Sequence, residues 1–365
     1  WIADDTFDLE RHVISARLSG AGGQAELEAY VSRLMATPLD FERPLWQFHL
    51  IENFQGGSAL VGRVHHSIGD GMSLIHVVLG LADNPPDGMG IASRPTLGDL
   101  AIGRPSFWHR AWRAVQMGAA SAVSLVRVLA LPADPSTVLR GRLGVEKRAV
   151  WSEPIALDEI KAIGKRLGGT VNDVLLSAMA GALRRYLEQR GQSAKGLNLR
   201  AVVPVNLRSP HETALGNKFG LVFLPLPVGH GEPMGRLRAL RRRMERIKRS
   251  PEPFVVYALL RLFGATTPQI LDLALNIFGR KATAVMTNVP GPRAPLVFVG
   301  HECESILFWV PQSGKLGMGV SILSYNGWVR VGLATDVGLV PDPGSILDHY
   351  AEMLRELKTL EVPAA

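Results

Sequence analysis

Segments with strand-like and helix-like patterns alternate through both halves of this chain, and that alternation is the strongest constraint on its fold. Apolar residues at helical spacing predict a helix that starts at residue 72 and helices over residues 24–36, 157–167, 171–189 and 344–360. Runs rich in β-branched and aromatic residues predict strands over residues 46–52, 59–64, 199–205, 219–227, 282–287, 316–324 and 328–335. The spacing lacks the short βα period of a barrel, so we expect an α/β or α+β architecture of two lobes.

A long connection is expected between the two lobes. The chain has 365 residues, which at about 150 residues per domain allows two domains. A stretch rich in glycine and proline runs from Asn84 to Pro105 and is the best candidate for the boundary. We therefore expect an N-terminal lobe over residues 1–104, a helical linker over residues 105–147 and a C-terminal lobe over residues 148–365. The acidic opening lacks Met, so we expect the chain to start inside a longer gene product.

Composition and charge exclude several classes of protein. The single cysteine, Cys303, excludes an internal disulfide framework and makes a cytosolic site the default. The net charge of +7 predicts attraction to phosphate groups in nucleic acid, on a membrane surface or on an anionic cofactor. No zinc-finger spacing or RNA-binding aromatic motif accompanies that charge, so we expect no nucleic-acid partner. No window of about 18 residues is apolar throughout, and no transmembrane span is predicted.

Two segments combine basic and apolar residues on a helical pattern. Residues 107–131 carry tryptophans and arginines, and residues 236–249 carry eight basic residues. The first segment either packs one face on the protein or lies on a membrane. The basic face of the second is either solvated or binds phosphates of coenzyme A or of anionic lipid headgroups. Packing against the protein, with the basic face in water, is the favoured interpretation of both.

Residues 65–71 read HHSIGDG and stand at the end of a predicted strand. Histidine is the side chain suited to taking and returning a proton near neutral pH, and the glycines beside Asp70 permit a sharp turn. Three interpretations remain open at this point: a structural loop, a metal site that uses His66 and Asp70, and a histidine base. The chain has no G-x-S-x-G elbow and no nucleophilic cysteine motif. This favours a histidine base that acts on an electrophile already activated.

The motif resembles the HHxxxDG signature of the coenzyme-A-dependent acyltransferase superfamily, which includes chloramphenicol acetyltransferase and peptide-synthetase condensation domains. Four further motifs follow in the order of one family: PLW at 44–46, ND at 172–173, VPVNLR at 203–208 with GN at 216–217, and TNVPGP at 287–292. With them the chain resembles the bacterial wax ester synthase/acyl-CoA:diacylglycerol acyltransferase (WS/DGAT) family over almost its whole length. Members usually carry further residues before the position that matches Trp1, and those residues belong to the first lobe.

This resemblance implies roles for the residues of the histidine loop. His66 would be the general base that takes the proton of the acceptor hydroxyl, and His65 would support the loop. Asp70 would turn away from the substrates and pair with Arg208, which would hold the loop before Gly71 in shape. A thioester is already an activated acyl donor, so no acyl-enzyme is needed. The resemblance implies no metal and no cofactor, because acyl-CoA is a substrate.

Three further residues are candidates for contact with the substrates. Trp46 would line the acyl channel, although core packing at a strand start is an equally weighted interpretation. Asn172 near a helix start would either face the substrate or cap the helix. Asn288, beside a Pro-Gly-Pro turn, ranks above Asn172 as a site residue.

The resemblance also implies a fold and a reaction. We expect two chloramphenicol-acetyltransferase-like lobes with the active site and a substrate tunnel at their interface. The enzyme would move a long-chain acyl group from acyl-CoA to diacylglycerol or a long-chain alcohol, which forms triacylglycerol or wax ester. We expect it in the cytoplasm, attached peripherally to the inner membrane or to a lipid droplet. Two alternatives remain: a condensation-type acyltransferase that uses a carrier-protein thioester, and a non-catalytic acyl-lipid-binding protein.

Overall fold

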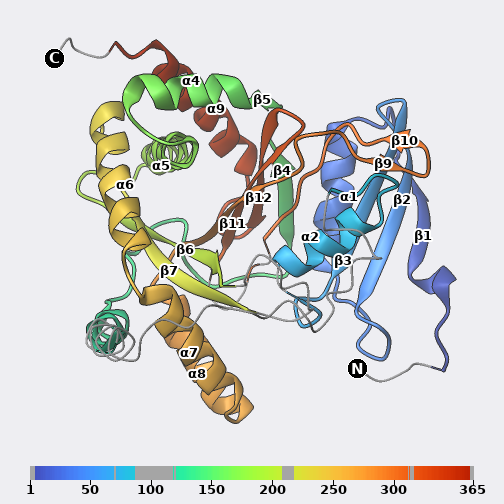
Figure 1. Ribbon diagram of the computed structural model, residues 1–365, viewed down its shortest axis with the longest axis horizontal. Helices are drawn as coiled ribbons and strands as arrows, with labels where there is room; N and C mark the ends of the chain where they lie inside the picture. Colours follow the sequence, from blue (N-terminus) through green and yellow to red (C-terminus); the bar gives the residue numbers. More distant parts are fainter. Residues whose placement is uncertain are drawn as a thin grey trace, which may run out of the picture.

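Two β-sheets, one in each lobe, form the framework of the protein (Figure 1). The computed structural model describes residues 5–69, 71–86, 118, 121–207, 218–310, 312 and 316–361. The small sheet has three strands and the large one has seven. The α/β architecture of two lobes that the sequence predicted is thereby confirmed.

The N-terminal lobe is a three-stranded sheet with a helix on one face. Ile51 of the central strand is fully buried against Leu27 and Val31 of the helix. The hairpin turn between the second and third strands places Asn53, Gln55 and Gly56 at positive φ. The elements are η1 (Leu9–Arg11), β1 (Val13–Arg17), α1 (Gln24–Ala36), β2 (Trp46–Phe54), β3 (Gly57–Val64) and α2 (Gly71–Gly80), and the strand order is β1-β2-β3.

The C-terminal lobe is built on the large sheet, in which the path runs β4-β12-β11-β8-β6-β7 and β5 pairs with β12. Strand β8 runs parallel to β11 and β6, and the other pairs are antiparallel. The strands are β4 (Lys147–Trp151), β5 (Ile155–Ala156), β6 (Leu199–Asn206), β7 (Phe219–Leu226), β8 (Ala284–Pro290), β11 (Met318–Tyr325) and β12 (Trp328–Asp336).

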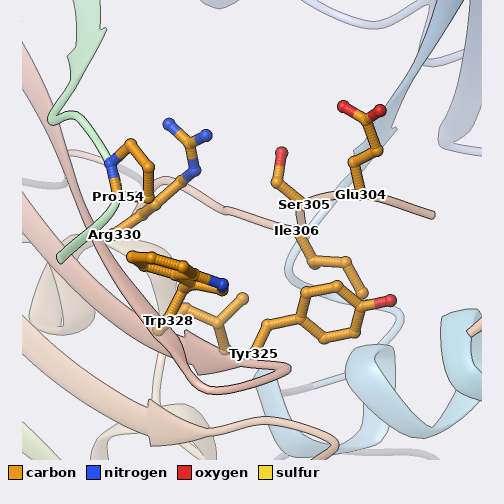
Figure 2. Close-up of a pocket in the computed structure, with 8 residues that line it drawn as sticks. Pro154, Glu304, Ser305, Ile306, Tyr325, Trp328 and Arg330 are labelled. Atoms are coloured by element: carbon orange, nitrogen blue, oxygen red, sulfur yellow. The ribbon is translucent and has the colours of Figure 1, made fainter. Parts of the chain in front are cut away.

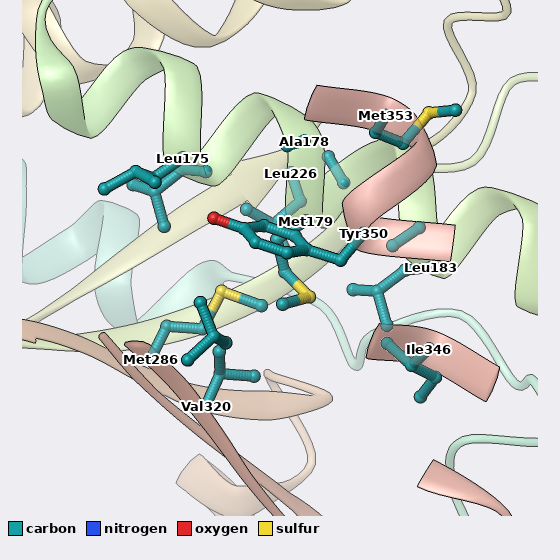
Figure 3. Packing of buried hydrophobic residues seen from close by; sticks show 14 of the residues in the cluster. Leu175, Ala178, Met179, Leu183, Leu226, Met286, Val320, Ile346, Tyr350 and Met353 are labelled. Carbon is teal, nitrogen blue, oxygen red and sulfur yellow. The ribbon is translucent and has the colours of Figure 1, made fainter. Parts of the chain in front are cut away.

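Alternate residues of this sheet enter two different apolar clusters, because successive side chains point to opposite faces. One face, with Met286 and Val320, packs against helices that bury Met179 and Tyr350 (Figure 3). The opposite face, with Val202 and Phe223, packs against other helices. The helices of the first face are α4 (Leu157–Leu167), α5 (Val171–Gln189), α6 (Pro233–Lys248) and α9 (Pro343–Thr359).

The second face is covered by helices that the sequence did not predict. They are α7 (Glu252–Gly264) and α8 (Pro268–Gly279), and helical residues 121–130 lie beside them. Both helices are rich in apolar residues, and each has a proline within its first turn. Residues 121–130 belong to the predicted amphipathic segment 107–131, and residues 107–117 lie outside the described ranges.

Helix α6 corrects one detail of the sequence analysis. Arg236 was counted with the basic solvent face, but its side chain is fully buried and donates hydrogen bonds to the carbonyl oxygens of Ser177, His230 and Gly231. Burial lowers the pKa of Arg236 to about 10. Arg238 remains exposed, and most of the other exposed basic residues of this helix lie toward its C-terminal end, such as Arg242, Arg246 and Lys248.

Both edges of the large sheet are covered by a helix that carries a glutamate. At the β4 edge, Glu28 of α1 accepts a hydrogen bond from the Trp151 backbone N–H at 3.3 Å. At the β7 edge, Glu252 of α7 accepts one from the Phe223 backbone N–H at 2.9 Å. Unpaired edge N–H groups are a site for unwanted strand pairing, and these carboxylates occupy them. Burial raises the pKa of both glutamates.

The first of these edge contacts also joins the lobes, because α1 belongs to the N-terminal lobe. Ser32 Oγ accepts a hydrogen bond from the Ala149 N–H at 2.9 Å, and Gln24 Nε2 donates to the Trp151 carbonyl at 3.0 Å. Trp151 packs edge-on against Trp309 beneath this contact. We call this contact between α1 and β4 the edge seam.

A segment of the C-terminal lobe makes the second connection between lobes. Between β8 and β11 the chain crosses to α2, forming the short strands β9 (Val297–Phe298) and β10 (His301–Glu302) (Figure 1). The Asp83 N–H donates to the Val297 carbonyl at 2.7 Å, and Leu79 of α2 packs with Leu296 and Tyr325. The lobes are thus fixed to each other at two separate places.

We predict that replacing both edge glutamates changes how stability depends on pH. A raised folded-state pKa means that each group's favourable contribution is complete below its unfolded pKa and is lost as pH rises through the folded value. A glutamine keeps the accepting oxygen and does not titrate. The free energy of unfolding of the Glu28→Gln/Glu252→Gln variant, relative to the unsubstituted protein, should therefore increase from pH 4 to pH 8. Urea unfolding at several pH values measures it.

The exposed Glu42 provides the matched control, since Glu42→Gln removes a carboxylate that is not buried. That variant should follow the unsubstituted protein at every pH. The prediction is wrong if the difference in free energy of unfolding between the double variant and the unsubstituted protein stays the same from pH 4 to pH 8. Burial would then not raise the pKa of the two glutamates.

Candidate active site

The histidine loop is a tight turn held to the preceding strand. The His65 backbone N–H donates to the Leu45 carbonyl at 2.9 Å, and the Ile68 N–H returns to the His65 carbonyl at 3.0 Å. The Ser67 N–H donates to His65 Nδ1 at 3.2 Å, and Ser67 Oγ lies 2.8 Å from the same nitrogen. Because Nδ1 accepts from a backbone amide, the His65 ring is a part of the turn.

His66 faces the other lobe. Its half-buried imidazole lies against the ring of Phe219, with 6.1 Å between the ring centroids and 60° between the planes. Phe219 is the first residue of β7 and pairs in register with Asn206, the last residue of β6. The ring of His66 therefore stands at the interface of the lobes, beside the end of β6.

The structure brings Asn172 and Asn288 together. Asn288 Nδ2 on β8 donates to Asn172 Oδ1 on α5 at 2.5 Å. Thr170 caps α5, as the sequence predicted: its Oγ1 accepts from the Asp173 N–H, and the Asp173 carboxylate accepts from the Thr170 N–H at 2.8 Å. Capping thus does not use Asn172, and its side chain holds the amide of Asn288 instead.

Trp46 lies next to the histidine loop in the sheet, but its recorded ring contacts are with other residues. It pairs in register with Val64, immediately before His65. The indole packs on His12 at 4.5 Å and on Phe48 at 5.8 Å between ring centroids. The His12 Nδ1 lies 2.7 Å from the Trp46 carbonyl oxygen. This geometry favours the packing interpretation of Trp46, and the acyl-channel role stays a prediction.

Of the other three residues predicted for the loop and its support, the structure describes only Gly71. Gly71 is the first residue of α2, and a Cβ added there would meet no described atom within 4 Å. Asp70 and Arg208 lie outside the described residues, so their predicted pairing stays a prediction. In the described ranges, no three histidine, cysteine, aspartate or glutamate side chains gather as a metal site would require.

A crevice of about 150 Å³ lies on the face of the large sheet opposite to the side chain of Asn288 (Figure 2). Its lining includes Leu323, which pairs in register with Val289, the residue after Asn288. Trp328 and Arg330 stand on one side of the crevice, and Glu304 and Ile306 stand on the other. Burial lowers the pKa of Arg330, and the nearby Glu153 and Glu304 oppose that shift.

Sequence reasoning did not identify Phe219 or the crevice residues as parts of a site. Phe219 reads as an ordinary apolar residue at a strand start, and its one signal is its position two residues after the GN pair at residues 216–217. The crevice combines residues from β11, β12 and the crossing segment, which no local pattern relates.

Chemically, the arrangement fits proton transfer without a protein nucleophile. An imidazole is the side chain suited to taking and returning a proton, and that of His66 stands at the interface of the lobes. The paired amides of Asn172 and Asn288 are dipoles held in place on the facing lobe, where they can orient a polar group of a substrate. The hydroxyl of Ser67, the residue after His66, lies 2.8 Å from His65 Nδ1.

Comparisons with known proteins agree over most of the chain. The model of the wax ester synthase/diacylglycerol acyltransferase catalytic domain matches residues 1–175, and that of the WS/DGAT C-terminal domain matches residues 215–358. A putative diacylglycerol O-acyltransferase of Mycobacterium tuberculosis is 28% identical over 98% of this chain and 76% of its own length. Wax ester synthase/diacylglycerol acyltransferase 7 of Arabidopsis thaliana is 28% identical over 98% of this chain and 85% of its own.

A solved structure also matches. The wax ester synthase/diacylglycerol acyltransferase from Marinobacter aquaeolei VT8 superposes with a TM-score of 0.69 and 26% sequence identity. The match covers 98% of this chain and 82% of the other. The fold that the sequence motifs implied is therefore confirmed.

We predict that Asn172 and Asn288 act as one unit in the fold. Removal of either partner breaks the same hydrogen bond, so the losses from Asn172→Ala and Asn288→Ala should not add in the double variant. A single hydrogen bond contributes about 0.5–1.5 kcal/mol net, and the coupling energy should fall in that range. Urea unfolding of the two single variants and the double variant measures it, and fully additive losses would contradict the contact.

Proposed function

This chain belongs to the wax ester synthase/diacylglycerol acyltransferase family, and we propose that His66 is the general base of its acyl transfer. The enzyme is an acyl-CoA-dependent O-acyltransferase, and its products are triacylglycerol or wax ester. The observation that carries the proposal is the position of the His66 ring, which lies against Phe219 of the facing lobe. His65 is less suited, because Nδ1 of its ring is engaged by the Ser67 amide within the turn.

In the proposed reaction the acceptor hydroxyl loses its proton to the His66 imidazole. The hydroxyl oxygen then attacks the thioester carbonyl carbon, which forms a C–O bond and a tetrahedral oxyanion. Collapse of this intermediate breaks the C–S bond, and the imidazolium returns the proton to the departing thiolate. The products are an ester and free coenzyme A, so atoms and charge balance without an acyl-enzyme.

The amide pair is proposed to orient a substrate from the other side. Asn288 gives one amide hydrogen to Asn172, which holds its planar group in one orientation. Its remaining polar atoms are then available at a fixed angle, and preorganised dipoles of this kind need no rearrangement during reaction. We assign Asn172 a positioning role, because it acts through Asn288.

Peripheral attachment to a membrane or a lipid droplet in the cytoplasm is part of the proposal. Diacylglycerol and long-chain alcohols reside in lipid, so the enzyme has to reach a lipid surface to bind them. None of the helices in the described ranges has the length and apolar character needed to cross a bilayer. The exposed basic end of α6 supports attraction to anionic headgroups.

We predict that His66→Ala lowers kcat by about 10²- to 10⁴-fold, the usual contribution of a general base. The measurement is release of the coenzyme A thiol from palmitoyl-CoA with hexadecanol, with dioleoylglycerol and with neither acceptor. His65→Ala is the matched control. It should lower the midpoint of thermal unfolding, because the His65 ring is part of the turn, and it should lower kcat less than His66→Ala does.

The same assay separates the alternatives. Turnover only with a carrier-protein thioester would indicate a condensation-type enzyme. Saturable binding of palmitoyl-CoA without acceptor-dependent release would indicate a binding protein. A His66→Ala variant with unchanged kcat would exclude His66 as the base.

A further inference from the structure

An apolar surface lies where α7, α8 and residues 121–130 meet. Nine large apolar side chains are exposed on these helices, out of twenty in the part of the chain that the structure describes. Contiguous exposed apolar side chains on a folded protein mark an interaction site. The members of this apolar surface are Val123, Val126, Leu129, Phe254, Leu262, Ile270, Leu273, Leu275 and Ile277.

Most of the exposed apolar side chains of α8 lie on one side of the helix, and Leu275 lies on another side. Ile270, Leu273 and Ile277 follow the i, i+3, i+7 spacing that places residues on one side of α8. Leu262 and Leu273 are each 61% exposed. In Figure 1, α7 and α8 extend away from the sheet at the lower edge of the view. The exposed apolar side chains therefore face outward from the body of the lobe.

Buried polar contacts fix these helices in place. The fully covered Lys281 donates from Nζ to the Val128 and Leu129 carbonyls at 2.8 and 2.7 Å, at the C-terminal end of residues 121–130. Asp134 accepts from Arg200 Nε at 2.8 Å just beyond it. The inner sides of the helices share one apolar cluster, which includes Val128 and Val256. The outward apolar surface thus belongs to a firmly packed unit.

Positive charge surrounds the apolar surface. The described parts of the three helices carry one exposed acid, Asp272. Three exposed cations, Arg127, Arg261 and Arg280, lie on them or directly at their ends, and three more lie where α6 leads into α7, beside the exposed acid Glu245: Arg246, Lys248 and Arg249. We call these six residues the cationic rim. An apolar centre within a cationic rim complements a phospholipid surface with anionic headgroups.

A second copy of this chain fits the surface less well. In a two-fold dimer each patch meets itself, so the cationic rims of the two copies would face each other. Like charges across an interface oppose association. A lipid surface also accepts short helices, since α8 at 12 residues is roughly 18 Å long and cannot span the hydrocarbon core.

The apolar surface is connected to the candidate active site through one backbone contact. A Cβ at Gly220 would lie 2.1 Å from the Pro253 carbonyl oxygen, so β7 and the first turn of α7 touch through their backbones. Gly220 follows Phe219, whose ring lies against His66. The helix that begins at this contact carries Phe254 and Leu262.

We propose that the apolar surface and its cationic rim form the docking site of this enzyme on a bilayer leaflet that contains anionic phospholipid. Docking there brings the Phe219 side of the active site toward the lipid in which the acceptor resides. The inference rests on the proposed function in one respect, that the acceptor is a lipid. The docking itself is tested by vesicle binding, which needs no turnover.

The test is flotation of the full chain with vesicles of phosphatidylcholine and phosphatidylglycerol, and with phosphatidylcholine alone. The Leu262→Ser/Leu273→Ser/Ile277→Ser variant should lower the partition coefficient at least about 100-fold, since burial of each leucine-sized side chain is worth roughly tenfold or more. The Arg246→Glu/Lys248→Glu/Arg249→Glu variant should abolish the preference for phosphatidylglycerol, and high salt should weaken binding of the unsubstituted protein.

The matched control removes equally exposed apolar side chains elsewhere. Leu60, Val145 and Val299 are 57%, 75% and 87% exposed, and the Leu60→Ser/Val145→Ser/Val299→Ser variant should bind vesicles as the unsubstituted protein does. Equal losses in the two serine variants, or no loss in either, would overturn the proposal. Light scattering that shows a dimer converted to monomer by the first variant, with vesicle binding unchanged, would assign the surface to self-association and overturn it as well.

A further measurement separates docking from catalysis. The midpoint of thermal unfolding should be the same for all variants within a few degrees. The Leu262→Ser/Leu273→Ser/Ile277→Ser variant should also retain turnover of hexanoyl-CoA with hexanol, two substrates that are in solution without vesicles. If the unsubstituted protein shows no turnover, the proposed function fails, while vesicle flotation still decides the docking proposal.

Discussion

The contact between α1 and β4 determines how the two lobes sit. A sheet of seven strands has two outer edges with unpaired backbone groups, and such edges have to be covered in a stable protein. This chain covers the β4 edge with a helix of the other lobe, through Gln24, Glu28 and Ser32. The lobes cannot rotate about this seam without breaking hydrogen bonds to the edge strand. The crossing segment on α2 fixes them at a second place.

The candidate active site depends on that arrangement because its groups come from both lobes. The N-terminal lobe supplies His66 on a turn that is tied to β2 and β3. The C-terminal lobe supplies Phe219 and the paired amides of Asn172 and Asn288. Neither lobe alone carries both a base and a set of orienting dipoles. Catalysis by positioning is sensitive to displacements of about 1 Å, so the rigidity of the seam is a functional requirement.

One of the glutamates that cover the sheet edges also connects the candidate site to the proposed docking surface. Glu252 accepts from Phe223 on β7, and Pro253 beside it touches Gly220. The same turn of α7 therefore covers an edge, supports the strand that carries Phe219 and begins the helix whose outer side is apolar. The exposed basic end of α6 and the apolar surface both belong to the C-terminal lobe.

The sequence by itself determined the local structure and the chemistry. The bounds of α1, α4 and α5 followed from periodicity, and the hypothesis of a histidine base came from the HHSIGDG turn, because these signals lie in neighbouring residues. Helices α7 and α8 were not predicted, and Arg236 was placed in solvent although it is buried and donates hydrogen bonds to carbonyl groups. Only the tertiary structure decided that Asn172 holds Asn288, that Phe219 meets His66 and that α1 covers β4. These pairs are separated by more than a hundred residues, and their contacts arise from how sheets and helices pack, which no local pattern encodes.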